Sequence, residues 1–182
     1  MVTPELSKSE LPALSNQALE ADLTQLLQRL LQRGEMLVTA ESCTGGLIAA
    51  ACTDLAGSSQ WFERGFVTYS NEAKTEMLGV PAALIAQHGA VSEPIARAMA
   101  RGALAHSRAQ VSLAVTGVAG PSGGSADKPV GTVWFAWCVG GSTGPTYSEV
   151  QHFAGDRAAV RSATLQHALA RLLHWMGLQT PG

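Results

Sequence analysis

The sequence contains few charged residues and no concentration of either sign. Asp, Glu, Lys and Arg make up 14% of the 182 residues, and the formal net charge is −2. The 12 Lys and Arg residues are scattered along the chain rather than clustered. Proteins that bind nucleic acid or an anionic membrane concentrate basic residues on one face. We therefore expect neither a nucleic acid nor a membrane as a partner.

Long apolar runs are absent as well. No stretch approaches the roughly 18 consecutive apolar residues of a membrane-spanning helix. The first residues include Glu5, Lys8 and Glu10 and lack the apolar core of a secretory signal. These two absences predict a cytoplasmic protein.

Cysteine and histidine show no pattern typical of a metal site. The three cysteines, Cys43, Cys52 and Cys138, cannot all pair with one another, and the five histidines form no His-x-x-x-His or His-Cys cluster. This usage favours reduced thiols in a reducing compartment, with Cys52 and Cys138 in the core. We expect no metal and no cofactor.

Hydrophobic residues make up 46% of the chain, enough for one full-sized core but hardly for two. Residues 1–16 are polar, contain two prolines and lack a period, which predicts a loosely ordered lead-in before one domain at 17–178. Periodicity and turn residues predict strands that alternate with helices. Helices are expected at 18–33, 47–55, 70–77, 81–88, 93–106 and 156–175, and strands at 36–40, 65–69, 111–115, 132–139 and 146–153.

The glycine-rich stretch 140–145 favours a hairpin between the last two strands, whereas the earlier strands are separated by helices. The predicted fold class is therefore α/β, a three-layer α/β/α sandwich with a mixed sheet in a single domain.

Residues 38–50 predict a buried strand that runs directly into a helix. An apolar run ends at Ser42, and a helical pattern of Leu and Ala begins at Leu47. The turn between them presents backbone N–H groups at the positive end of a helix, where a hydroxyl would meet a substrate. The arrangement is similar to the nucleophile turn of serine hydrolases, although neither their Gly-x-Ser-x-Gly pattern nor a common nucleotide fingerprint is present. Ser42 or Thr44 as a plain helix cap stays open.

A second candidate segment is the loop 116–129, which leaves the carboxyl end of a buried strand. Open α/β sheets bind ligands at this edge, and the glycines of the loop permit close approach of the backbone. Its length of fourteen residues is unusual for a connector in a compact domain. We therefore interpret it as functional.

Several motifs in the same order resemble the CinA C-terminal-domain family, and the resemblance covers roughly residues 23–173. The motifs are TAESCTGG at 39–46, GSSQWF at 57–62, GFVTYSNEAK at 65–74, HGAVS at 88–92, TGVAGP at 116–121 and KPVGTV at 128–133.

The resemblance implies a nicotinamide-nucleotide amidohydrolase that converts nicotinamide mononucleotide and water to nicotinic acid mononucleotide and ammonia, in NAD recycling. It implies Ser42, Tyr69 and Lys74 as catalytic residues, and a homodimer. Ser42 would attack the carboxamide, Lys74 would act as base if burial lowers its pKa, and Tyr69 would relay the proton or bind the developing oxyanion. Cys43 is the rival nucleophile, but the adjacent position favours a structural thiol.

The phosphate of such a substrate has two candidate places. One is the helix start at Thr44, Gly45 and Gly46, and the other is the loop from Thr116 and Gly117 to Gly120. Arg157 could add a bidentate grip or form a surface salt bridge, and Glu41 could orient the lysine or satisfy the helix N-terminus. We count all eight as candidate substrate-binding residues.

Two other functions stay open. The domain could bind a pyridine nucleotide without hydrolysing it, as a regulatory module, or it could be a serine–lysine hydrolase of another small amide. Ammonia release from nicotinamide mononucleotide would distinguish the amidohydrolase from the binding module, and a panel of amides would identify a hydrolase of another substrate.

Overall fold

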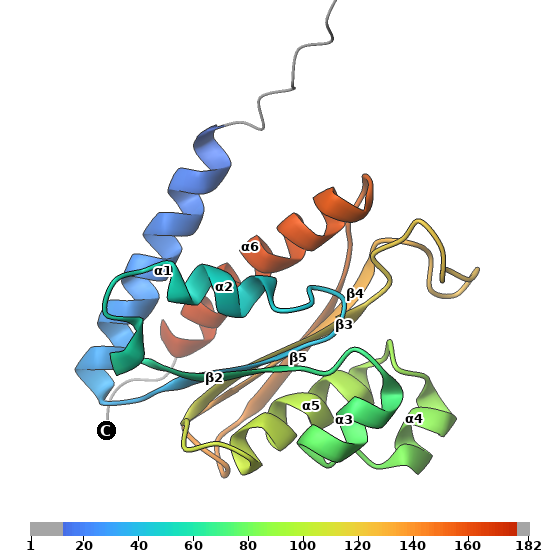
Figure 1. Cartoon of the computed structure of the whole chain (residues 1–182), viewed down its shortest axis with the longest axis horizontal. Helices are drawn as coiled ribbons and strands as arrows, with labels where there is room; N and C mark the ends of the chain where they lie inside the picture. Colours follow the sequence, from blue (N-terminus) through green and yellow to red (C-terminus); the bar gives the residue numbers. More distant parts are fainter. Residues whose placement is uncertain (1–12, 178–182) are drawn as a thin grey trace, which may run out of the picture.

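The computed structural model describes residues 13–177 and places a five-stranded sheet between two layers of helices (Figure 1). The elements follow in the order α1 (Ala13–Arg33), β1 (Leu37–Glu41), α2 (Leu47–Thr53), the 3-10 turn η1 (Ser58–Gln60), β2 (Phe62–Val67), α3 (Asn71–Leu78), α4 (Ala82–His88), α5 (Glu93–Ala105), β3 (Val111–Gly117), β4 (Thr132–Val139), β5 (Thr146–His152) and α6 (Arg157–Gly177).

The sheet is mixed, with the strand order β2-β1-β3-β4-β5. β1 pairs in parallel with both β2 and β3, whereas β3 with β4 and β4 with β5 pair antiparallel. Helices α1, α2 and α6 cover one face of this sheet, and α3, α4 and α5 cover the other (Figure 1). The predicted α/β/α sandwich with a mixed sheet is confirmed.

The two faces of the sheet carry side chains of different size. Phe135 and Trp137 of β4 lie in the cluster that packs against α1, α2 and α6. The opposite face presents Ala40, Ala114 and Ala136 toward α5. Because successive strand residues point to opposite faces, this alternation separates a large aromatic core from a thin one against which α5 packs closely.

Some boundaries differ from those predicted. Helix α1 begins at Ala13, inside the expected lead-in, and residues 1–12 lie outside the described part of the chain. Strand β2 runs from Phe62 to Val67 instead of 65–69, because Phe62 already pairs with Leu37 of β1 and the backbone leaves the sheet after Val67. Strand β3 continues to Gly117, which pairs with Val133 at the start of β4.

The candidate segments meet at one edge of the sheet. The parallel strands β1, β2 and β3 all end there, β4 starts there, and Thr132 of β4 pairs with His152 at the end of β5, which leads into α6. The chain thus brings segments from four distant parts of the sequence to the edge where open α/β sheets bind ligands. No helix within residues 13–177 has the length and apolarity needed to cross a membrane.

Candidate active site

Ser42 is the first residue after β1 and begins the turn into α2. Its N–H donates to the carbonyl of Val115 in the neighbouring strand β3, at 3.1 Å, which fixes the backbone of the turn to the sheet. Gly45 and Gly46 follow with φ of 61° and 98°, a conformation that favours glycine. The side chain of Ser42 remains 8% exposed, so its hydroxyl is nearly buried but still reached by solvent.

Lys74 lies on the inner face of α3 and points at Ser42. The helix starts at a cap in which the Ser70 hydroxyl accepts the N–H of Ala73 at 3.0 Å. One turn into the helix, Lys74 Nζ lies 3.1 Å from Ser42 Oγ. The backbone that leaves β2 curls around the same nitrogen, with the Thr68 carbonyl at 2.8 Å. Lys74 is 1% exposed, so these contacts replace its hydration shell.

Burial lowers the pKa of Lys74 below its ordinary value, against smaller opposing effects from Cys43 and the Glu72 carboxylate. A deprotonated amine keeps two N–H donors for backbone carbonyls and offers its lone pair to the Ser42 hydroxyl. The pair therefore has the geometry of a nucleophile with an adjacent general base. Burial raises the pKa of Cys43 to about 11, so this neighbouring thiol is protonated and weakly nucleophilic at neutral pH.

Glu41 binds the start of α2 with both oxygens of its carboxylate. One oxygen accepts the Thr44 hydroxyl at 2.7 Å and the backbone N–H groups of Gly46 and Ile48, and the other accepts the N–H of Ala49 at 2.8 Å. Glu41 is 1% exposed. Of the two roles left open for it, the geometry supports the satisfaction of the helix N-terminus.

This arrangement bears on the first of the two places expected for a phosphate. The amides that would have held a phosphate at the start of α2 are already bound, by the Glu41 carboxylate or, for Gly45, by the Ser42 carbonyl at 3.1 Å. The Thr44 hydroxyl donates to the same carboxylate, so its proton is not available to a phosphate. Glu41, Thr44, Gly45 and Gly46 therefore shape the turn that carries Ser42 and do not line the cavity in front of it.

Tyr69 and Arg157 form a bridge across the other side of the site. Tyr69 follows β2 and is 60% exposed, and its hydroxyl accepts a hydrogen bond from Arg157 Nη2 at 2.8 Å. Arg157 Nη1 donates to the carbonyl of Gly120 at 2.9 Å. The tyrosine hydroxyl is thus held by the arginine, while its backbone carbonyl lies 3.4 Å from Lys74 Nζ.

A cavity of about 350 Å³ opens over the Ser42–Lys74 pair. It is lined by Ser42, Cys43, Tyr69, Lys74, Ala90, Val91, Thr116, Gly117, Val118, Ala119, Gly120, Ser122, Gly123 and Arg157. The lining contains a lysine and an arginine but no carboxylate, and a cavity of this size accommodates a small molecule. Three catalytic candidates and four substrate-binding candidates from the sequence, Thr116, Gly117, Gly120 and Arg157, are brought together here.

Sequence reasoning missed Arg161, one turn beyond Arg157 on α6. Its Nη2 donates to the carbonyl of Thr44 at 2.8 Å, so it contacts the turn that carries Ser42 from a distant part of the chain. The only signal in the sequence was the spacing of two arginines at i and i+4, which places both on one helix face.

Thr116 has a structural contact in addition to its place in the cavity wall. Its hydroxyl donates to the carbonyl of Ala90 and so connects the α4–α5 loop to β3.

A sequence model of a protein family, described as the CinA C-terminal domain, matches residues 19–176. Nicotinamide-nucleotide amidohydrolase PncC of Escherichia coli (strain K12) is 52% identical over 167 residues, 92% of this chain and 95% of that protein. A protein of the same name from Pseudomonas putida is 54% identical over 82% of this chain and 92% of its own length. The crystal structure of competence/damage inducible protein CihA from Agrobacterium tumefaciens matches with a TM-score of 0.83 at 44% identity, covering 91% of this chain and 98% of that one.

Proposed function

The chain belongs to the CinA C-terminal domain family, and on this basis we propose that it is a nicotinamide-nucleotide amidohydrolase. It hydrolyses the carboxamide of nicotinamide mononucleotide to nicotinic acid mononucleotide and ammonia. The observation that carries the proposal is the buried amine of Lys74, 3.1 Å from the hydroxyl of Ser42 at the floor of a small-molecule cavity. Relatives that share about half of their residues with this chain bear the name of that activity.

The first step is the attack of Ser42 on the carboxamide carbon. Lys74, in its neutral form, accepts the proton from Ser42 Oγ while the C–O bond forms and the carbonyl oxygen becomes negative. The ammonium that results is held by the Thr68 carbonyl at 2.8 Å, with the Tyr69 and Ser70 carbonyls at 3.4 Å. Three carbonyl dipoles therefore stabilise the positive charge at the moment when it appears.

The second step releases ammonia. Lys74 passes its proton to the amide nitrogen, the C–N bond breaks, and the nicotinoyl group remains as an ester on Ser42. Water then attacks this ester, Lys74 accepts the proton of the water, and the same proton returns to Ser42 Oγ as the acid leaves. Each proton that Lys74 accepts is returned, so the cycle restores the starting enzyme.

In this proposal, Tyr69 contributes by holding the Arg157 guanidinium in position. Its hydroxyl holds the guanidinium at 2.8 Å, and the guanidinium reaches the Gly120 carbonyl on the far side of the cavity. Thr116, Gly117 and Gly120 line the same cavity, and we propose that they contact the pyridine and ribose of the substrate. The tyrosine and arginine together define the rim that a substrate must pass.

We also propose that the protein works in the cytoplasm as a homodimer. The three cysteines are buried and free, as is usual in a reducing compartment. Val67 at the end of β2 and Met77 in α3 are large apolar side chains that stay 44% and 40% exposed, and a second copy would cover such surfaces.

Ammonia release tests the proposed function. We expect the purified chain to release one ammonia for each nicotinic acid mononucleotide formed from nicotinamide mononucleotide, measured by coupled ammonia assay and chromatography of the product. Release from asparagine, glutamine and free nicotinamide serves as the comparison for substrate class. Binding of the mononucleotide without ammonia release would instead identify a binding module, and preferred turnover of another amide would identify a different hydrolase.

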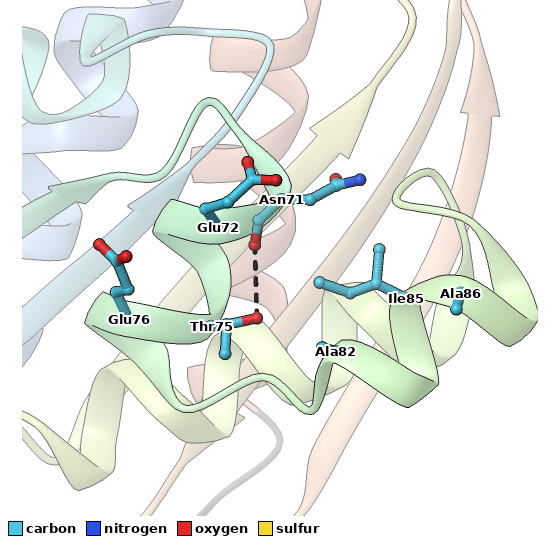
Figure 2. A pocket seen from close by; sticks show the side chains of 7 residues that line it. All are labelled: Asn71, Glu72, Thr75, Glu76, Ala82, Ile85 and Ala86. Carbon is cyan, nitrogen blue, oxygen red and sulfur yellow. Dashed lines mark hydrogen bonds between the residues drawn. The ribbon is translucent and has the colours of Figure 1, made fainter.

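The charge of Glu72 tunes the base. Glu72 lines the groove between α3 and α4 (Figure 2) and is not among the residues that line the cavity over Ser42. Its carboxylate nevertheless raises the pKa of Lys74, although less than burial lowers it. In Glu72→Gln this opposing effect is lost and the pKa of Lys74 falls further. Because the base must be neutral, the acid limb of the profile of kcat/KM against pH moves to lower pH.

Glu76→Gln is the matched control for Glu72. Glu76 lies one turn further along α3, is equally exposed and lines the same outer groove, but it does not act on Lys74 (Figure 2). We expect the acid limb of the control to coincide with that of the wild type. A Glu72→Gln profile that moves to higher pH, or stays in place, would contradict Lys74 as the titrating base.

A further inference from the structure

The first two turns of α6 carry two arginines, Arg157 and Arg161, that contact the segments around the active site. Arg157 donates to the Gly120 carbonyl and to the Tyr69 hydroxyl, and Arg161 donates to the Thr44 carbonyl. All three acceptors are carbonyl or hydroxyl oxygens, and none is a carboxylate. The two guanidiniums therefore have contacts that orient them, but none that neutralises them.

Neither arginine has a counter-ion. Among residues 13–177, no carboxylate lies within 4.0 Å of the guanidinium of Arg157 or Arg161, although Arg64, Arg97 and Arg171 each pair with a glutamate. The Nε of Arg161 is fully buried and has no hydrogen-bond partner in the described part of the chain. A buried donor without a partner costs free energy, and Arg161 is partly buried, so a ligand that accepts a hydrogen bond from its Nε would remove this cost.

The two arginines line a second cavity, of about 480 Å³. It is formed by Ala119, Pro121, Val130, Gly155, Asp156, Arg157, Ala158 and Arg161. Ala119 and Arg157 also line the cavity over Ser42, so the two cavities adjoin there. The carboxylate in the second cavity, Asp156, accepts the N–H of Ala159 at 2.9 Å and caps α6. The arginine side chains, and not the helix start, supply the positive charge.

We propose that this second cavity is the subsite for a phosphate monoester, held between Arg157 and Arg161. The inference rests on the proposed function, because a mononucleotide places one phosphate at the end remote from the reacting amide. The adjoining cavities match that division, with the amide over Ser42 and the phosphate past Arg157. Guanidinium groups bind phosphate oxygens through paired N–H donors. The phosphate supplies the counter-ion that the pair lacks.

Arg161 is the residue that distinguishes this subsite from a purely structural contact. Its bond to the Thr44 carbonyl holds the guanidinium in place before the substrate arrives. If Arg161 only supported the turn that carries Ser42, its loss would lower kcat/KM for every substrate by the same factor, since the turn would move. A role in phosphate binding affects only substrates that carry the phosphate.

The test compares Arg161→Gln with wild type on two amides, nicotinamide mononucleotide and its dephosphorylated nucleoside. We expect the kcat/KM for the mononucleotide to fall about 10- to 100-fold more than that for the nucleoside, through KM, as for loss of a charged hydrogen bond to phosphate, while the lost bond to the Thr44 carbonyl lowers kcat/KM for both substrates by the same factor. Arg161→Lys should recover part of the loss. Arg101→Gln, an exposed arginine on α5, removes the same charge elsewhere and should leave both substrates unaffected.

Binding of ribose 5-phosphate, measured by calorimetry, is an independent readout. We expect binding to wild type that Arg161→Gln weakens by a similar factor. An equal loss on mononucleotide and nucleoside, or unchanged ribose 5-phosphate binding in Arg161→Gln, would overturn the subsite. If wild type binds ribose 5-phosphate through Arg161 but releases no ammonia from the mononucleotide, the proposed function fails and the subsite stands.

Discussion

Lys74→Met abolishes turnover while leaving a folded protein. We expect kcat/KM for ammonia release from nicotinamide mononucleotide to fall about 10⁴-fold, because Ser42 loses the group that takes its proton. Methionine matches the length of the lysine stem and removes a buried polar head that is 1% exposed. The free energy of unfolding should change little, because an amine no longer has to be desolvated while the Thr68 carbonyl loses its donor. Steady-state kinetics and urea unfolding measure the two quantities on the same preparation.

Ser42→Ala and Cys43→Ala complete this experiment. Ser42→Ala should lose as much activity as Lys74→Met, and the double variant should lose no more, because nucleophile and base act as one unit. Cys43→Ala should keep activity within a few-fold, since the thiol is buried and protonated at neutral pH. Activity retained by Ser42→Ala and lost by Cys43→Ala would transfer the nucleophile to the cysteine.

Glu41→Ala destabilises the fold and disables the site together. The substitution leaves the Thr44 hydroxyl and the backbone N–H groups of Gly46, Ile48 and Ala49 without their shared acceptor. Donors that lose a buried charged partner cost about 3–5 kcal/mol in the free energy of unfolding. That is a large share of the roughly 5–15 kcal/mol that holds a domain folded. Urea unfolding measures the loss, and ammonia release falls because the turn of Ser42 is no longer fixed.

Glu20→Ala provides the comparison for a carboxylate without this role. Glu20 is exposed on α1, and its removal should change the free energy of unfolding by no more than about 0.5 kcal/mol. Glu41→Gln should lie between the two, because its amide keeps one acceptor oxygen but faces the remaining donors with an NH₂ group. Equal stability of Glu41→Ala and wild type would mean that water replaces the carboxylate.

Periodicity predicted the architecture well because each element carries its own signal. The leucine spacing of α1, the Ser70 cap of α3 and the glycines at 140 and 141 are local features, and local features decide where a helix or hairpin forms. The ends of β2 were predicted less well. Phe62 joins the strand by pairing with Leu37, which the sequence around Phe62 does not encode.

In the candidate site too, local signals could be used from the sequence, whereas contacts between distant segments could not. Ser42 and Lys74 could be proposed from the sequence because family motifs surround both, and the turn after β1 marks the first of them. The role of Glu41 could not be decided, because it depends on which N–H groups the folded turn presents to one carboxylate. The contact made by Arg161 could not be predicted because its partner, the Thr44 carbonyl, lies 117 residues away in the chain.

That separation also sets when the enzyme can begin to work. The turn that carries Ser42 follows β1, but the arginine that supports it comes from α6. Helix α6 is in turn clasped to α1, where Arg29 donates to the Leu173 carbonyl and Arg33 to the Met176 carbonyl, each at 2.6 Å. A ribosome must therefore release nearly the whole domain before the first and last helices can close over the sheet. Until then the nascent polypeptide carries its serine and lysine without a complete binding site, so biosynthesis itself delays catalysis.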